Sequence, residues 1–402
     1  MNLFRKYVTV TLFSAGLALA GQGVGVYDYS DNMPPSRTHP SSESIPVEQV
    51  PMFISFGFDD NGINIPGQGV DWILNYLRDK TNPGTGNPGT YDGAPMRASF
   101  YVTSKYGKQW VYHNYPAIRQ GWRALYEDGH EIGNHSDIHL GYWDNDLQKF
   151  FEFKGYDYTK EQWLAEELDP CHEFLIKPYG MNAQAHGLGM EESDIYGWRT
   201  PRLEWNNAVF EALVERGYVY DCSINSESDN DGTSNYWPFT MDEGHPFIDS
   251  VASFPGFWQL PCYQFMIPPN LQDKVGTASM TGLDYNVWAR TDLGGKELTA
   301  AEFTRILKHT LDLRMAGNRA PMLIGLHSDI YSEQKDSDYP ASGTYRDRQL
   351  AIERFVDYAL ETYPEVRFVP AIDVINWMRN PVSLSGELSV NTEKKTLKTI
   401  CQ

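Results

Sequence analysis

Hydrophobic and polar positions follow two alternating patterns over most of the chain. Short apolar runs bounded by turn residues predict buried strands, at 52–58, 97–103, 130–136, 195–201, 218–224, 257–262, 321–327 and 367–373. Apolar residues three or four positions apart predict amphipathic helices, at 70–80, 207–217, 300–314 and 348–363. Strands alternating with helices predict an α/β fold with a mostly parallel sheet, and the number of repeats favours a closed or nearly closed barrel.

The ends of the chain and its long loops complete the predicted organisation. Residues 1–20 have a basic start, an apolar stretch and a small-residue end, which is the layout of a signal peptide rather than a membrane anchor. Long segments with turn residues are often functional loops; they lie at 81–94, 225–248 and 328–346. The predicted division is a signal peptide (1–20), a linker rich in Ser, Pro and Gly (21–46), a single catalytic domain (47–382) and a C-terminal tail (383–402).

The first predicted strand ends on two adjacent carboxylates, Asp59 and Asp60, in the motif DDNG. Like charges side by side repel, and burying either is unfavourable without a partner. A solvated turn is one interpretation, because Asp, Asn and Gly favour turns. A functional site is the other, since successive side chains of an extended chain point to opposite sides. One carboxylate can then bind a cation while the other accepts a proton.

His135 and His139, in GHEIGNHSDIHL, stand four residues apart. On a helical turn this spacing places both imidazoles on one face, but alone it is a weak metal signal. The glutamate of a zinc-protease motif is also missing. Together with Asp60, the pair makes a two-histidine, one-carboxylate set that suits zinc or another divalent metal. All three residues follow predicted strands, whose ends a barrel gathers at one mouth.

Three further residues accompany predicted strands. Arg199, in YGWRTP, is a fixed charge suited to pairing with a carboxylate such as Asp59, although a surface salt bridge is the alternative. His327 ends an apolar strand, where a histidine can be a general acid near neutral pH or can be structural. Trp258 can stack on a sugar ring if it lies near a groove, although most tryptophans in such a domain are core residues.

Taken together and in this order, these motifs resemble the polysaccharide deacetylases of carbohydrate esterase family four, the NodB-homology proteins, over most of residues 50–382. The chain looks most like arthropod-type chitin deacetylases, through RASFYVTSKYG, GHEIGNHSDIH, NNAVFEALVERGYVYDCSI, WPFTMD, SFPGFWQLP and INWMRNPV. The resemblance implies a distorted (β/α) barrel that hydrolyses acetyl groups of amino sugars. It also implies a divalent metal, zinc or another such as Co²⁺.

The resemblance assigns roles to residues at the matching positions. It implies metal ligands at Asp60, His135 and His139. Asp59 matches the catalytic base, Arg199 the arginine that orients it, and His327 the general acid that protonates the leaving amine. The backbone N–H of Arg202 and the ring of Trp258 are the predicted substrate contacts.

Four positions depart from the family pattern. Gly57 replaces the threonine before FDD, and Arg202 stands where an aromatic residue is common after R-x-P, which makes a groove wall cationic. Gly325 replaces the apolar residue two before the last histidine, so the usual lining of the acetyl pocket is in doubt. The fourth motif, a carboxylate followed by tryptophan, has only Asp221 and Trp258 as candidates.

The composition limits the classes of binding partner and indicates the cellular compartment. The 402 residues are 41% hydrophobic, enough for a substantial core. The net charge of −20, or −22 once the two cationic residues of the signal peptide are removed, argues against nucleic acid and anionic polymers. Four cysteines can form up to two disulfides in an oxidising compartment, with three connectivities, and their scatter speaks against structural zinc; they are Cys171, Cys222, Cys262 and Cys401.

The leading hypothesis is a secreted or periplasmic, monomeric, metal-dependent N-deacetylase. Its expected substrate is an N-acetylglucosamine polymer or oligomer, most of all chitin, and no membrane attachment is expected after signal cleavage. One alternative is an O-acetyl esterase acting on another polysaccharide such as xylan. Another is a non-catalytic carbohydrate-binding protein on the same scaffold, which the departures at Arg202 and Gly325 favour. Glycoside hydrolysis is disfavoured because Asp59 and Asp60 are adjacent rather than facing.

Overall fold

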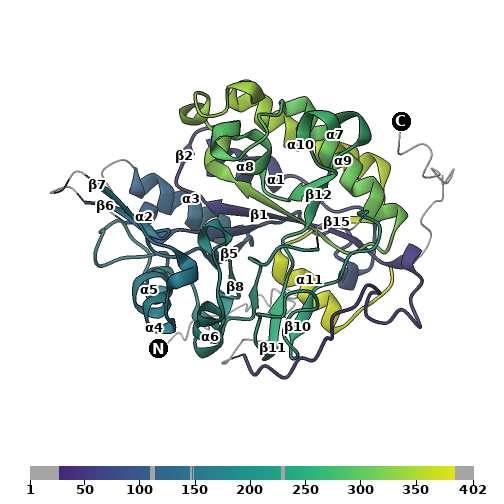
Figure 1. Cartoon of the computed structure of the whole chain (residues 1–402), viewed down its shortest axis with the longest axis horizontal. Coiled ribbons are helices and arrows are strands. Elements are labelled where there is room, and N and C mark those ends of the chain that lie inside the picture. The colour runs from purple at the N-terminus through teal and green to yellow at the C-terminus, as the bar shows by residue number, and fades with distance from the viewer. Residues whose placement is uncertain (1–26, 109–113, 145–146, 148, 228–230, 385–402) are drawn as a thin grey trace, which may run out of the picture.

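The computed structural model describes residues 27–108, 114–144, 147, 149–227 and 231–384, so the predicted signal peptide lies outside it. Nine strands of these residues form one sheet, in the order β10-β11-β9-β8-β5-β4-β1-β14, with β15 also paired to β1 (Figure 1). They are β1 (Met52–Asp60), β4 (Ser99–Val102), β5 (Glu131–Asn134), β8 (Gly197–Trp198), β9 (Tyr220–Asp221), β10 (Phe239–Met241), β11 (Phe254–Gln259), β14 (Met322–His327) and β15 (Val366–Phe368). The β10–β11 pair is antiparallel, and the other pairs in this sheet are parallel.

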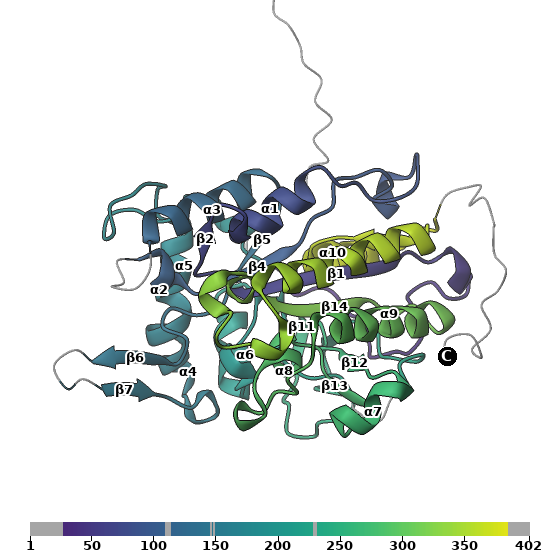
Figure 2. The same cartoon turned by 90° about the horizontal axis from the view of Figure 1, so that it is seen from above.

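Helices pack against this sheet (Figures 1 and 2). They are α1 (Val70–Arg78), α2 (Ser104–Gly107), α3 (Tyr115–Glu127), α4 (Lys160–Gln162), α5 (Asp169–Ile176), α6 (Asn207–Glu215), α7 (Pro269–Val275), α8 (Asp284–Trp288), α9 (Ala300–Ala316), α10 (Tyr345–Thr362) and α11 (Ala371–Arg379). A π-helical turn (Trp163–Leu168) joins α4 to α5. Capping boxes start α9 at Thr299 and α10 at Thr344. The four predicted helices are confirmed as α1, α6, α9 and α10.

The apolar run of β1 is explained by burial on both faces of the sheet, as expected for a parallel strand. Ile54, Phe56 and Phe58 belong to a core between the sheet and the helices. Phe53 points the other way, into a second core with Tyr101 and Trp258 inside the barrel. The two-residue period of the strand therefore divides one apolar run between two cores.

The barrel is nearly closed, as predicted. Between β14 and the strands at the other end of the sheet lies a small antiparallel pair, β12 (Gln264–Met266) with β13 (Ser279–Thr281). Isolated bridges join Leu283 to Gly325 on one side and Asn225 to Cys262 on the other. Two further antiparallel pairs lie outside the barrel: β2 (Asn64–Ile65) with β3 (Gln68–Gly69), and β6 (Gly141–Asp144) with β7 (Lys149–Glu152).

Two sequence expectations are corrected by the fold. The described part of the predicted linker, 27–46, packs on the domain instead: Tyr27 is buried and its hydroxyl donates to the Gly256 carbonyl at 2.7 Å. The expected disulfides are not found among the described cysteines, because Cys171, Cys222 and Cys262 are all buried free thiols. Cys401 and most of the predicted tail lie outside the described residues. Among the described helices, none is long and apolar enough to cross a bilayer.

Candidate active site

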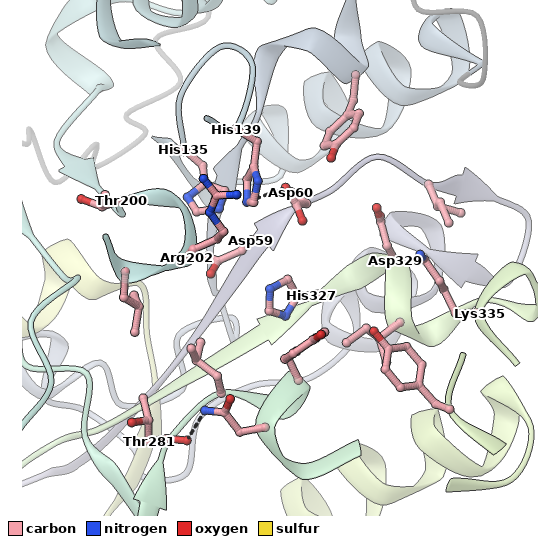
Figure 3. A pocket seen from close by; sticks show the side chains of 18 of the residues that line it. Asp59, Asp60, His135, His139, Thr200, Arg202, Thr281, His327, Asp329 and Lys335 are labelled. Atoms are coloured by element: carbon pink, nitrogen blue, oxygen red, sulfur yellow. Dashed lines mark hydrogen bonds and ion pairs between the residues drawn. The ribbon is translucent and has the colours of Figure 1, made fainter. Parts of the chain in front are cut away.

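A cavity of about 890 Å³ opens at the carboxyl ends of the parallel strands (Figure 3). Its lining includes most of the residues singled out in the sequence, namely Asp59, Asp60, His135, His139, Arg202 and His327. These side chains come from the ends of β1 and β14 and from the loops after β5 and β8. Residues far apart in the sequence therefore meet because parallel strands end at one mouth.

The DDNG motif forms a tight turn that separates the two carboxylates. Asp60 has φ +66° and Asn61 φ +62°, and the Asn61 N–H donates to the Asp59 carbonyl at 2.8 Å. Left-handed backbone is unfavourable for both residues and persists only where contacts hold it. Asn61 provides them: it is fully buried, and its side chain donates to the carbonyls of Phe58 and Tyr101 at 2.8 and 3.1 Å. Asp60 is the last residue of β1, and its backbone turn directs its carboxylate toward the two histidines.

The two histidines converge through a loop. His135 follows β5, and its Nδ1 donates to the Arg199 carbonyl at 2.7 Å, which leaves Nε2 to face the cavity. His139 has φ +57°, so a loop in left-handed backbone, and not a helical turn, brings the two imidazoles together. Glu167, on the π-helical turn, is fully buried and accepts the N–H groups of Ile138 and Leu140, both at 3.0 Å. This carboxylate holds the loop, and nothing in the local sequence pattern pointed to it.

Asp60, His135 and His139 fit a divalent metal ion. Each offers one ligand atom, and these atoms lie within 4.8 Å of one another. Asp60 Oδ1 is 3.7 Å from His139 Nε2, and Thr103 donates to the same oxygen at 3.2 Å. Burial lowers the pKa of His139 to about 3, against the attraction of Asp60, so its imidazole is neutral and has a free lone pair. Two imidazoles and a carboxylate are a donor set typical of zinc.

Asp59 is paired with Arg199, as the sequence predicted. Arg199 Nη1 donates to Asp59 Oδ1 at 2.9 Å, and both side chains are almost fully buried. The guanidinium lies over the ring of Tyr101 at 4.6 Å. A Cβ on Gly57 would lie 2.9 Å from Arg199 Nη2 and 3.0 Å from the Tyr101 ring. The glycine that departs from the family pattern therefore makes room for this arginine.

His327 has a carboxylate partner that the sequence did not reveal. Its Nδ1 and Asp284 Oδ1 are 2.7 Å apart, and its backbone N–H donates to Asp284 Oδ2 at 3.0 Å. Burial alone would lower the pKa of His327, but Asp284, helped by Asp59 and Asp60, raises it to about 9. Asp59 and His327 are register partners on the neighbouring strands β1 and β14. The imidazolium thus stands beside the proposed base.

Asp284 also corrects the fourth motif. It is followed by Tyr285, which lines the cavity, so the carboxylate–aromatic pair is Asp284–Tyr285. The earlier candidate Asp221 is buried and accepts both the backbone N–H and the hydroxyl of Ser223, at 2.8 and 2.5 Å. Trp258 is wrong as a substrate contact: its ring is fully buried and its indole N–H donates to Asp31 at 2.7 Å.

The structure also explains the departures from the family pattern at Arg202 and Gly325. The Arg202 side chain pairs with Glu152 and lies 3.6 Å from Glu204, so it does not present a free cation to the cavity. Gly325 leaves a space that Leu283 fills, because a Cβ there would lie 2.1 Å from Leu283 Cδ2. Leu283 lines the cavity in its place. The apolar wall has moved to another segment and is still present.

Of the three long loops, 328–346 contributes most to this cavity. Asp329, Gln334, Lys335 and Tyr339 line its far side, whereas 225–248 contributes Asn225. Segment 81–94 instead contributes Asp92 to a buried ion pair with Arg367, at 2.6 Å. Two of the three long loops thus contribute to the cavity, 328–346 through several residues and 225–248 through one.

The comparisons with known proteins agree with this architecture. No protein-family model matches the chain. Chitin deacetylase 1 of Bombyx mori is 23% identical over 344 residues, which are 84% of this chain and 52% of that protein. The chain therefore spans about half the length of this curated relative. A Mycobacterium smegmatis protein assigned as a polysaccharide deacetylase has a similar structure, with a TM-score of 0.50, 15% identity and coverage of 87% of this chain and 95% of that one.

The family 4 carbohydrate esterase of Streptomyces lividans matches more weakly, with a TM-score of 0.33, 14% identity and coverage of 78% and 90%. The first structure shows that this chain shares its fold. With the curated relative, it confirms the resemblance to the polysaccharide deacetylases of carbohydrate esterase family four.

Proposed function

We propose that this protein is a metal-dependent N-deacetylase that hydrolyses acetamide groups of N-acetylglucosamine polymers or oligomers, chitin in the first place, and releases acetate. One observation carries the proposal. Asp59 and His327 are register partners on adjacent strands, and the cluster of Asp60, His135 and His139 lies at the same mouth. A base, an acid and a metal site within one cavity are what amide hydrolysis needs.

The cluster is the proposed metal site, for zinc or another divalent ion such as Co²⁺. The bound ion supplies Lewis-acid polarisation of the acetyl carbonyl and acidifies the attacking water. Asp59 accepts the proton of that water. Arg199 orients Asp59 through their 2.9 Å bond. The backbone N–H of Arg202, which lines the cavity, is the proposed donor to the developing oxyanion.

His327 is the proposed general acid. An amine is a poor leaving group until it is protonated, so amide hydrolysis requires an acid on the other side of the reacting carbon. With its pKa raised to about 9, His327 carries a proton at neutral pH. Asp284 fixes the tautomer by occupying Nδ1, which leaves Nε2–H for the substrate nitrogen.

The substrate class and the compartment are part of the proposal. A net charge of −20 supports a neutral glycan over an anionic one. The signal-peptide pattern of residues 1–20 supports secretion. The two departures that favoured a non-catalytic scaffold leave the catalytic groups undisturbed, since Leu283 fills the space at Gly325 and Arg202 is paired with Glu152.

The deciding experiment measures acetate released from N-acetylglucosamine oligomers of two to six units. Metal-stripped protein is assayed before and after zinc is added back, and Asp60→Ala is assayed in parallel. We expect zinc to restore release in the native protein and to have no effect in the variant. If zinc-loaded native protein releases acetate from no oligomer length, the N-deacetylase proposal fails. If Asp60→Ala responds to zinc like the native protein, the proposed metal site fails.

A further inference from the structure

The Tyr101 ring, inside the barrel, supports the Arg199 guanidinium at 4.6 Å. Tyr101 is buried on β4, and its register partners are Asp59 on β1 and Gly133 on β5. A Cβ on Gly133 would lie 2.6 Å from the ring, and one on Gly57 would lie 3.0 Å from its opposite edge. Two glycines of the neighbouring strands therefore leave a slot that the ring fills, and the ring is held in one orientation.

The Tyr101 hydroxyl begins a chain of buried hydrogen bonds that leads away from the cavity. It lies 2.8 Å from the Tyr220 hydroxyl, and Tyr220 donates to Glu131 Oε1 at 2.7 Å. A phenol has one proton, and Tyr220 gives its proton to the carboxylate, so Tyr101 donates to the Tyr220 oxygen. A Cβ on Gly197 would lie 2.1 Å from Tyr220 Cζ, so a third glycine makes room for the second ring.

Glu131 anchors the far end of this chain at the N-terminus of α11. Its Oε2 accepts the Ser99 hydroxyl at 2.6 Å and the Ile372 N–H at 3.2 Å, and Ser99 Oγ accepts the Ala371 N–H at 2.8 Å. The N-terminal end of a helix favours a negative charge. Each polar group of the chain has a partner, and a fully satisfied buried network is rigid.

The chain ends at Arg199, and this separates it from a network that only stabilises the core. Apart from its bond to Asp59, the guanidinium has only long contacts to protein carbonyls, at 3.2 Å to Gly57 and 3.4 Å to Cys222. The attraction between a cation and an aromatic face is strongest where both are desolvated, as they are here. Hydrogen bonds in a chain polarise one another, so donation toward a carboxylate makes the Tyr101 ring a better partner for the cation.

We propose that Tyr101 is a positioning residue of the catalytic centre, which acts through Arg199 and is itself held by Tyr220 and Glu131. The inference rests on the proposed function, because Arg199 orients Asp59, the proposed base. It extends the catalytic machinery from the cavity to the inside of the barrel, as far as the first turn of α11.

The experiment measures kcat and KM for an N-acetylglucosamine oligomer, together with zinc affinity. We expect Tyr101→Leu, which removes the ring, to lower kcat about tenfold. Tyr220→Phe, which breaks the chain but keeps the shape, should lower kcat about threefold. KM and zinc affinity should stay native in both variants. Tyr101→Phe keeps the ring and should recover most of the activity that Tyr101→Leu loses.

The matched control is Tyr263→Phe. Tyr263 is also buried, also lies under an arginine, Arg314, at 5.0 Å, and also donates its hydroxyl proton, to the Tyr236 carbonyl at 2.7 Å. It lies outside the cavity lining, so the variant loses a comparable buried hydrogen bond but should keep the native kcat. Native kcat in Tyr101→Leu and Tyr220→Phe overturns the proposal. If Tyr101→Leu does not fold, Tyr220→Phe decides against Tyr263→Phe, and equal kcat values overturn it.

A double-mutant cycle tests whether Tyr101 acts through Arg199. In Arg199→Gln, which removes the cation from the ring, we expect Tyr101→Leu to lower kcat by no more than about twofold further. An undiminished tenfold effect in that background overturns the proposal, because Tyr101 would then influence catalysis without Arg199.

A structural readout keeps this inference separate from the proposed function. If the native protein releases no acetate from any oligomer, the proposed function fails, and the positioning of Arg199 is tested by NMR. The readout is the solvent exchange of the Arg199 Nε–H, assigned by its loss in Arg199→Gln. We expect exchange in Tyr101→Leu to be about tenfold faster than in Tyr263→Phe. Equal exchange rates in the two variants overturn the proposal.

Discussion

Each of the two sides of the cavity places a histidine near a carboxylate, but the pKa of the histidine is lowered on one side and raised on the other. On the metal side, His139 Nε2 is 3.7 Å from Asp60, and the pKa of His139 is lowered to about 3. On the acid side, His327 Nδ1 is 2.7 Å from Asp284, and the pKa of His327 is raised to about 9. The same residue type is therefore kept neutral at one position and protonated at the other.

The difference comes from the shorter contact between His327 and its carboxylate and from the remaining neighbours of each histidine. Burial lowers the pKa of both histidines. His139 also faces cations, among them Lys105 and Arg202, and these lower its pKa further. His327 faces anions instead: Asp284 in direct contact, then Asp59 and Asp60. A metal ligand must offer a lone pair and a general acid must hold a proton, so each environment suits the role proposed for its histidine.

Replacement of His327, the proposed general acid, should show most clearly that the acid side and the metal side have different roles. We expect His327→Ala to lower kcat for an acetamide substrate by roughly 10²–10⁴, the usual contribution of a general acid. Zinc affinity should stay native, because His327 is outside the ligand cluster. In the same variant, kcat for an acetate ester should fall less, because the alkoxide leaving group of an ester needs less protonation than an amine. Steady-state kinetics and zinc titration of the same preparations provide the test. Asp60→Ala is the control variant, which should lose both amide hydrolysis and zinc binding. Intact amide hydrolysis in His327→Ala would exclude it as the acid.

A smaller effect is expected when the charge on the acid side is removed without changing its shape. In Asp284→Asn, burial is no longer opposed by the adjacent carboxylate, so the pKa of His327 falls. Activity needs the protonated form, which the native protein loses only as pH rises through about 9. The alkaline limb of the kcat profile should therefore move to lower pH, and kcat at pH 8 should fall about tenfold or more. An alkaline limb that stays at the native pH would contradict this account.

The matching change on the metal side is Glu167→Gln. This substitution keeps the shape but loses one of the two acceptor oxygens for the Ile138 and Leu140 amides. The loop that carries His139 should loosen, and we expect zinc affinity to fall about tenfold, as for other residues that orient ligands. Competition with a chromophoric chelator measures this. The pH profile of kcat at saturating zinc should remain native, so a shifted alkaline limb would show that the two sides are not independent.

Local signals were sufficient for much of the fold. The eight apolar runs and four amphipathic segments all correspond to strands and helices of the structure, because periodicity and turn residues act over a few positions. The metal cluster and the Asp59–Arg199 pair could also be predicted, since parallel strand ends share one mouth. The loop that joins His135 to His139 could not be predicted, because a buried glutamate 28 residues beyond His139 holds it.

Side-chain partners across elements were decided only in three dimensions. Asp284 lies 43 residues before His327, and only the position of α8 beside β14 brings the two together. Trp258 could have been a groove residue or a core residue on its sequence alone, and the inward face of β11 buried it. Local sequence patterns were sufficient for the main strands, for four of the helices and for the candidate ligands, base and acid of the site. The tertiary structure decided which charge faces which histidine, and hence which one is neutral and which is protonated, because electrostatic effects depend on distances that no local pattern encodes.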